Sequence, residues 1–126
     1  MNLEIKIQQK LQETNYDCGQ TCLEMLGYDG YGMFNGREMD SNDFRSLQGV
    51  EEVTVPIGQE ENLDYSFPHI WLILPKARFV SGTSAHFVIR HRDQIYCPRV
   101  GTVNYQEYKQ KYVGFVLQEF LVPFKR

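Results

Sequence analysis

The stretch Gln12-Glu-Thr-Asn-Tyr-Asp-Cys-Gly-Gln-Thr-Cys-Leu-Glu-Met-Leu-Gly27 changes at Cys18 from polar residues to a helical pattern. From Cys18 onward, apolar or small residues recur about every three to four positions, which is the spacing of an amphipathic helix. Asp17 suits the N-cap position, and Gly27 is a natural C-terminal stop. This stretch therefore predicts a helix over residues 17–26 with a cysteine in its first turn.

A cysteine at the start of a helix is a candidate nucleophile. The free N–H groups and the positive end of the helix dipole favour a thiolate, so we expect a lowered thiol pKa at Cys18. Gly19 follows it and, because it has no Cβ, we expect it to leave room for a substrate backbone. The alternative is a buried structural cysteine, which is the usual state of a free thiol.

Outside this helix, the first half of the chain shows only short elements. Residues 3–7 alternate apolar and polar side chains, which is typical of a short strand. Residues 27–40 contain four glycines and are expected to form a loop. Ser41 is expected to cap a short helix that reaches Leu47.

The second half of the chain has a β pattern. Strands are expected over residues 69–74, 85–91, 94–98 and 115–122, with a helix over 105–112 and a brief strand near Val50–Val55. A turn near Arg92 and Asp93 joins two of these strands. A helix followed by an antiparallel sheet predicts the α+β class.

Length and composition predict one domain over residues 1–126, with 42% hydrophobic and 23% charged residues. The net charge of −3 gives no basic face for nucleic acid. The longest apolar run, Ile70–Leu74, is far shorter than the roughly 20 residues of a membrane span. We therefore expect no nucleic-acid partner, no membrane span and no signal peptide.

The cysteine count points to free thiols. Three cysteines cannot form a complete disulfide set, and Cys18 and Cys22 are not spaced as a C-x-x-C pair. We therefore expect unpaired thiols in a reducing cytoplasm, with no metal and no cofactor.

His86 is the candidate general base, since it opens the apolar run Phe87–Ile89, and a Cys–His pair is a nucleophile with its base. The alternative is a structural histidine. His69 and His91 compete for the role. His69 also begins a strand, but its flanking residues match no known site, and His91 lies between two arginines and is expected to be solvated.

Four motifs in order resemble one family. Residues 12–25 closely resemble the opening motif of the bacteriocin-processing, double-glycine leader peptidases, which are papain-like cysteine peptidases. Residues 85–89 are similar to the family's His motif, and residues 96–101 resemble its Asp-Pro-x-x-Gly turn. Residues 105–115 resemble its closing helix and strand. The resemblance covers nearly the whole chain and implies a papain-like fold, with the catalytic-Cys helix packed on an antiparallel sheet.

The resemblance also implies roles for matched positions. Cys18 would be the nucleophile, His86 the general base, and Gln12 would donate its side-chain amide to the oxyanion beside the Cys18 N–H. Removing one such donor can cost about 10²–10³ in rate. The implied substrate is a peptide or protein, cleaved after small residues such as a Gly-Gly pair.

One position departs from the family. Cys97 stands where the family has an Asp that would accept a hydrogen bond from the histidine and fix its tautomer. A thiol is only a weak acceptor. Asn104 is a second candidate for this third position, since an Asn orients the histidine in some cysteine peptidases.

Three hypotheses follow. The leading one is a thiol hydrolase, specifically a cysteine peptidase. The second is a catalytically silent relative that binds peptides or a partner protein. The third is an amidase or deamidase that uses the same site, because the fold and the catalytic residues do not set the substrate.

Overall fold

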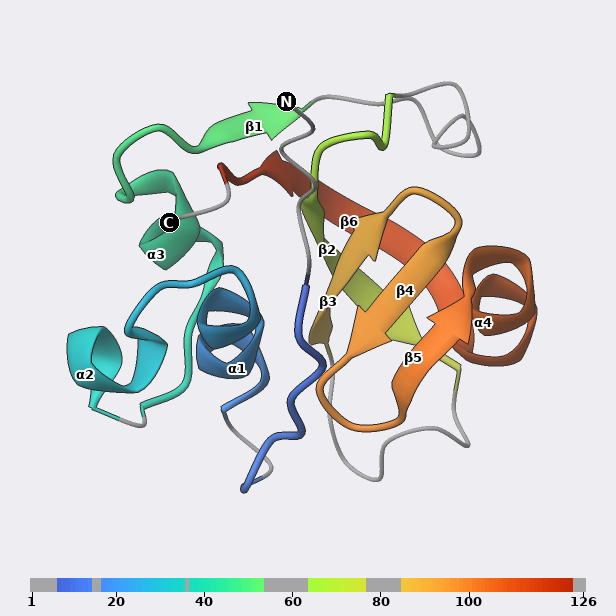
Figure 1. The fold of residues 1–126 in the computed structure, drawn as a ribbon, viewed down its shortest axis with the longest axis horizontal. Helices are drawn as coiled ribbons and strands as arrows, with labels where there is room; N and C mark the ends of the chain where they lie inside the picture. Colours follow the sequence, from blue (N-terminus) through green and yellow to red (C-terminus); the bar gives the residue numbers. More distant parts are fainter. Residues whose placement is uncertain (1–6, 15–16, 36, 54–63, 77–84, 124–126) are drawn as a thin grey trace.

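The structure is a computed structural model that describes residues 7–14, 17–35, 37–53, 64–76 and 85–123. The helices are α1 (Cys18–Met25), α2 (Gly30–Phe34), α3 (Ser41–Arg45) and α4 (Tyr105–Tyr112). The strands are β1 (Glu51–Val53), β2 (His69–Pro75), β3 (His86–His91), β4 (Gln94–Cys97), β5 (Gly101–Asn104) and β6 (Val113–Leu121). They form one antiparallel sheet in the order β1-β6-β2-β3-β4-β5 (Figure 1). The expected α+β class is confirmed.

The sheet lies between two helical layers. Helices α1, α2 and α3 are on one side of it, and α4 is on the other (Figure 1). Phe87 and Ile89 of β3 pack in the core with α1, whereas Val88 packs in the core with α4. Every residue of β3 is buried, both the apolar run Phe87–Ile89 and the polar residues His86, Arg90 and His91.

Helix α1 matches the expected helix within a residue at each end. Asp17 occupies the N-cap position as expected, but its side chain makes no capping hydrogen bond. The Asp17 carboxylate is 1% exposed and is used elsewhere, as described below.

The expected loop over residues 27–40 contains a helix. The Asp29 carboxylate accepts a hydrogen bond from the Gly32 N–H at 3.0 Å, and this cap starts α2 despite the glycines. Gly30 is needed for packing, because a Cβ there would lie 2.4 Å from the Gln20 carbonyl oxygen. The local cap and the close approach to α1 therefore outweigh the low helix propensity of glycine.

Helix α3 also differs from its prediction. Its N-cap is Asp40 rather than Ser41, with a reciprocal capping box to Asp43, and it ends at Arg45 rather than Leu47.

Strand β5 was not expected, because it is a short edge strand that alternates half-buried and exposed residues. The expected turn between β3 and β4 is present, with Arg92 at a φ of 53°. The expected strand over residues 3–7 lies outside the described residues except for Ile7. Val55, the end of the brief strand expected near Val50–Val55, also lies outside them. Within the described part of the chain, no helix is long and apolar enough to cross a membrane.

Candidate active site

Cys18 is the first residue of α1, and the N-terminal end of this helix lies against β3. Its side chain is half-buried and lies close to the Phe87 backbone N–H. Burial raises the pKa of the Cys18 thiol, and the Phe87 and Gly19 N–H groups lower it by less. The expected lowering of this pKa is therefore wrong in direction, because desolvation outweighs the helix end.

Gly19 serves packing rather than substrate access. It is buried, and a Cβ there would lie 3.0 Å from the Met39 Cβ and 3.3 Å from a Phe87 ring carbon. The glycine lets the start of α1 approach β3 closely, which brings Cys18 beside the residue that follows His86.

His86 begins β3 and is 2% exposed. Its Nε2 atom lies 3.4 Å from the Cys97 Sγ atom, so the structure brings these two predicted residues together. Burial, with a contribution from the nearby Arg99 charge, lowers the pKa of His86 to about 4. The imidazole is therefore neutral near pH 7. A negative charge on Cys97 would raise the pKa of Cys18. Cys97 is therefore near enough to that thiol to interact with it electrostatically.

Cys97 ends β4 and is fully buried. Its sulfur contacts His86 and also accepts hydrogen bonds from the Tyr108 hydroxyl at 3.2 Å and the Arg99 N–H at 3.4 Å. Asn104 is used differently, because its side chain accepts from the N–H groups of Gln106 and Glu107 and caps α4. Of the two candidates for the third position, Cys97 is the one in contact with the imidazole.

Gln12 lies beside the end of β4. Its backbone N–H donates to the Pro98 carbonyl at 2.6 Å, and its side-chain amide donates to the Thr14 carbonyl at 2.6 Å. Its Oε1 atom is buried and has no hydrogen-bond partner among the described residues. The amide is thus close to the Cys97 segment but is turned toward its own loop, so binding an oxyanion would require this amide to rotate.

Asp17 holds the segment that carries Gln12 onto α1. Its carboxylate accepts from the N–H groups of Glu13 and Thr14, each at 3.0 Å, and from the hydroxyl groups of Thr14 and Tyr31. Burial raises the pKa of Asp17, but these hydrogen bonds together lower it by more. The net shift of the Asp17 pKa is therefore downward. Burial and Asp17 together raise the pKa of Tyr31 to about 12. This role is not visible in the sequence, where Asp17 also fits an N-cap.

All three cysteines are free, which confirms the expected unpaired thiols. Cys22 is fully buried, and its thiol donates to the Phe87 carbonyl at 3.5 Å. Burial raises its pKa well above the ordinary value, so Cys22 is a core residue.

The other two histidines lie in buried polar surroundings. His69 Nδ1 is paired with Glu119, and the Tyr65 hydroxyl donates to the same carboxylate at 3.2 Å. His91 is 4% exposed, with its Nε2 atom 3.2 Å from the Ser66 carbonyl oxygen. The expectation that His91 is solvated is wrong, because the segment around Ser66 covers the end of β3.

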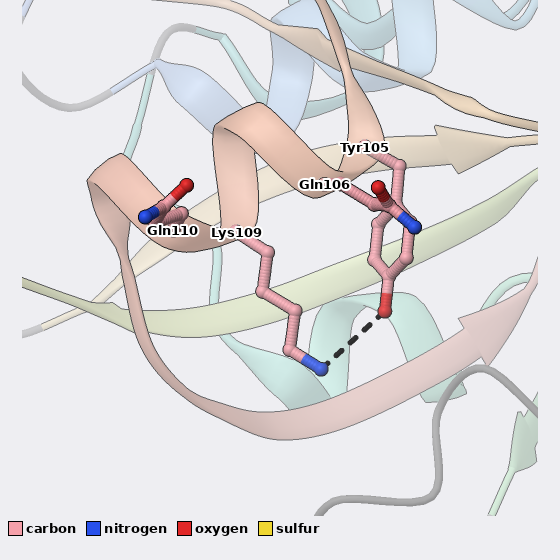
Figure 2. A pocket seen from close by; sticks show the side chains of 4 residues that line it. All are labelled: Tyr105, Gln106, Lys109 and Gln110. Carbon is pink, nitrogen blue, oxygen red and sulfur yellow. Dashed lines mark hydrogen bonds between the residues drawn. The ribbon is translucent and has the colours of Figure 1, made fainter.

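A surface pocket lies on α4 (Figure 2), where Lys109 Nζ donates to the Tyr105 hydroxyl at 3.4 Å. Its described lining residues are Tyr105, Gln106, Lys109 and Gln110. None of the predicted catalytic residues is among them. Across the described residues, no group of three or more His, Cys, Asp or Glu side chains is placed to hold a metal ion.

Comparison with known proteins adds no family. Neither the protein-family models nor the curated proteins contain a match to this chain.

Proposed function

We propose that this protein is a papain-like thiol hydrolase that cleaves a peptide bond with Cys18 as nucleophile and His86 as base. The observation that carries the proposal is the contact of 3.4 Å between His86 Nε2 and Cys97 Sγ. By the resemblance, position 97 is that of the family's acid, and this contact supports such a role for Cys97. Cys18 meanwhile lies at the start of a helix that packs on the histidine-bearing strand.

The chemistry proceeds through an acyl-enzyme. The Cys18 S–H proton passes to His86 while the sulfur bonds to the carbonyl carbon, and the carbonyl oxygen takes the negative charge. The C–N bond then breaks, and His86 gives its proton to the leaving amine. Water attacks the thioester with His86 again as base, which releases the acid and restores the Cys18 thiol.

The oxyanion needs donors during these steps. The Cys18 N–H is free of an intrahelical partner because it is in the first turn of α1. The Gln12 amide is the second donor, and to reach the oxyanion it must exchange its hydrogen bond to the Thr14 carbonyl for one to the substrate.

Burial keeps both catalytic groups uncharged at rest, which disfavours formation of the reactive thiolate. Burial raises the pKa of Cys18 and lowers that of His86 to about 4, so the resting pair is a thiol and a neutral imidazole. Substrate binding must therefore precede proton transfer. The uncharged state of both groups at rest, together with a thiol at the acid position, also supports the second candidate, a silent relative that binds peptides.

Alkylation kinetics separate the two candidates. The protein is treated with iodoacetamide near pH 7, and labelling of each cysteine is followed by peptide mass spectrometry. For the hydrolase we expect Cys18 to label first and its rate to fall about tenfold or more in His86→Gln, since general-base assistance typically contributes about 10²–10⁴. His91→Gln is the matched control, because it removes a buried histidine from the other end of the same strand.

The functional readout is cleavage of peptides that contain a Gly-Gly pair, with Cys18→Ala as the inactive control. A Cys18 labelling rate that is the same with and without His86, together with no turnover, would overturn the hydrolase and favour the silent relative. Release of ammonia from amides without peptide cleavage would instead indicate an amidase.

A further inference from the structure

Hydrogen bonds from the backbone to a buried carboxylate hold the turn that follows Gln12. The Asp17 carboxylate is 1% exposed, and its two oxygens accept from the Glu13 and Thr14 N–H groups, each at 3.0 Å. The side-chain amide of Gln12 donates to the Thr14 carbonyl at 2.6 Å, and its backbone N–H donates to the Pro98 carbonyl at 2.6 Å. Asp17 therefore fixes the residue whose carbonyl receives the Gln12 amide.

Tyr31, in α2, supplies a further donor to this carboxylate. Its hydroxyl donates to the Asp17 oxygen that also accepts from the Glu13 N–H. The same hydroxyl lies 2.9 Å from the Thr21 Oγ1 atom of α1, and the Tyr31 backbone N–H donates to the Glu24 carboxylate at 3.2 Å. Helix α2 packs against α1 (Figure 1), so Tyr31 is held on α1 through both its backbone and its hydroxyl.

We propose that Asp17 and Tyr31 are positioning residues that hold the Gln12 amide where it can reach the oxyanion. This inference rests on the proposed function, in which Gln12 is the second oxyanion donor. The amide must leave the Thr14 carbonyl to reach the substrate, so the turn must stay in place while the side chain rotates. A donor that is held near its final position loses less conformational freedom in the transition state than a donor on a loose turn.

The charge of Asp17 acts against the neighbouring nucleophile. Burial raises the pKa of the Cys18 thiol, and the Asp17 carboxylate raises it further. Despite its burial, Asp17 has a pKa below its ordinary value because of its hydrogen bonds, so its charge is present near pH 7. A residue that served only the Cys18 thiolate would be better uncharged. The carboxylate thus favours the turn, which needs two acceptor oxygens, at the expense of the thiolate.

Asp17→Asn separates these two effects. Asparagine has one acceptor oxygen, so one N–H group of the turn loses its partner. Alkylation of Cys18 by iodoacetamide forms no oxyanion, so loss of the charge should make it about two- to fivefold faster near pH 7. The kcat for a peptide with a Gly-Gly pair should instead fall about tenfold or more, because its transition state needs the oxyanion donors. An Asp17→Asn variant that cleaves as fast as the wild type would overturn the proposal.

Tyr31→Phe keeps the Asp17 charge and removes one donor. We expect Cys18 alkylation within about twofold of the wild type and a kcat about three- to tenfold lower at unchanged KM, the factor that one net hydrogen bond supplies. In the Gln12→Ala background the same substitution should lower kcat no further, because the donor that it positions is gone. Equal losses in both backgrounds would show a general structural effect and overturn the proposal.

Tyr65→Phe is the matched control. The Tyr65 hydroxyl also donates to a buried carboxylate, that of Glu119, at 3.2 Å, and this carboxylate is paired with His69. We expect this variant to be less stable but to keep the wild-type kcat. A fall in kcat as large as in Tyr31→Phe would show that the loss of any buried tyrosine hydroxyl slows the enzyme, which would contradict a specific role for Tyr31.

The two proposals fail in different ways. The NMR signals of the Gln12 side-chain amide, assigned with Gln12→Ala, report its position without any turnover. In Tyr31→Phe they should move towards those of a solvated glutamine, whereas the Gln118 amide, which donates to the Glu52 carboxylate at 3.3 Å, should keep its signals. Unchanged Gln12 signals would overturn the positioning role even in a protein that cleaves peptides. Absence of cleavage in the wild type would overturn the hydrolase, and moved Gln12 signals would then still support the hold of Tyr31 on this turn.

Discussion

Two buried histidines near opposite ends of β3, His86 in that strand and His69 in the neighbouring β2, have contrasting surroundings. At the first residue of β3, His86 meets a thiol, Cys97, which in turn contacts Tyr108. At its other end, Arg90 is paired in register with His69 of β2, and His69 meets the Glu119 carboxylate. Both histidines are at least 95% buried. The contrast is therefore in the partner atom, a sulfur in one case and a carboxylate oxygen in the other.

The His69 end has the carboxylate that a cysteine peptidase would use, but it has no thiol beside it. All three cysteines belong to α1 or to the end of β4. Glu119 is instead part of a buried network with Tyr65, and the Arg90 guanidinium lies 4.0 Å from the Tyr65 ring centre and 3.4 Å from that of Tyr105. We infer that the His69 end stabilises the fold, while the His86 end, which has the thiols, supplies the candidate chemistry.

The largest expected effect is at the structural end. Glu119→Ala would leave His69 and the Tyr65 hydroxyl without their shared acceptor, and breaking such a buried pair typically costs about 3–5 kcal/mol of the free energy of unfolding. Denaturant unfolding measures this loss, and Cys18 labelling in the folded fraction should not change. Glu107→Ala, at an exposed pair with Lys111, is the control and should cost under about 0.5 kcal/mol. Equal losses in both variants would contradict the division between the two ends.

The next effect concerns the pH dependence of stability at the His86 end. The folded pKa of His86 is about 4, below the ordinary value of 6.5, so the unfolded chain binds this proton first as the pH falls. His86 therefore lowers the free energy of unfolding as the pH falls from 6.5 to 4, by about 3 kcal/mol in total.

His86→Gln removes this proton uptake while leaving the carboxylates in place. Subtracting the stability curves of the two proteins should therefore leave a difference that grows only between pH 6.5 and pH 4. Parallel curves over this range would show that His86 titrates normally in the folded protein.

The long, strongly patterned elements of the fold could be predicted from the sequence. Helices α1 and α4 and strands β2 and β3 have apolar periodicity that decides their type locally. Helix α2 and strand β5 could not be predicted in this way. The first depends on one Asp29 cap and a close approach to α1, and the second depends on pairing with β4.

For the candidate site, the order of the motifs predicted which residues lie together, but the sequence did not predict the pKa shift of Cys18. The motifs put His86 and Cys97 in the same site, and the structure shows them in contact. The direction of the Cys18 pKa shift was mispredicted, because a helix end is visible in the sequence but the burial of a thiol is not. The hydrogen bonds of Tyr31 to Asp17 and of Tyr108 to Cys97 are tertiary contacts, which the sequence does not show.

The smallest expected effect separates the two candidates for the third position. Asn104 caps α4 through Gln106 and Glu107, so Asn104→Ala should cost about 1 kcal/mol of the free energy of unfolding, the usual value for a lost N-cap. The rate of Cys18 alkylation near pH 7 should stay within about twofold of the wild type, because the contact between His86 and Cys97 is untouched. Asn104→Asp is the matched variant, since aspartate caps helices about as well as asparagine and should restore stability. If Asn104→Ala instead slowed alkylation as strongly as His86→Gln, Asn104 would be the residue that orients the imidazole. Cys97 would then be a packed core thiol, and the contrast between the two ends of β3 would have to be explained without it.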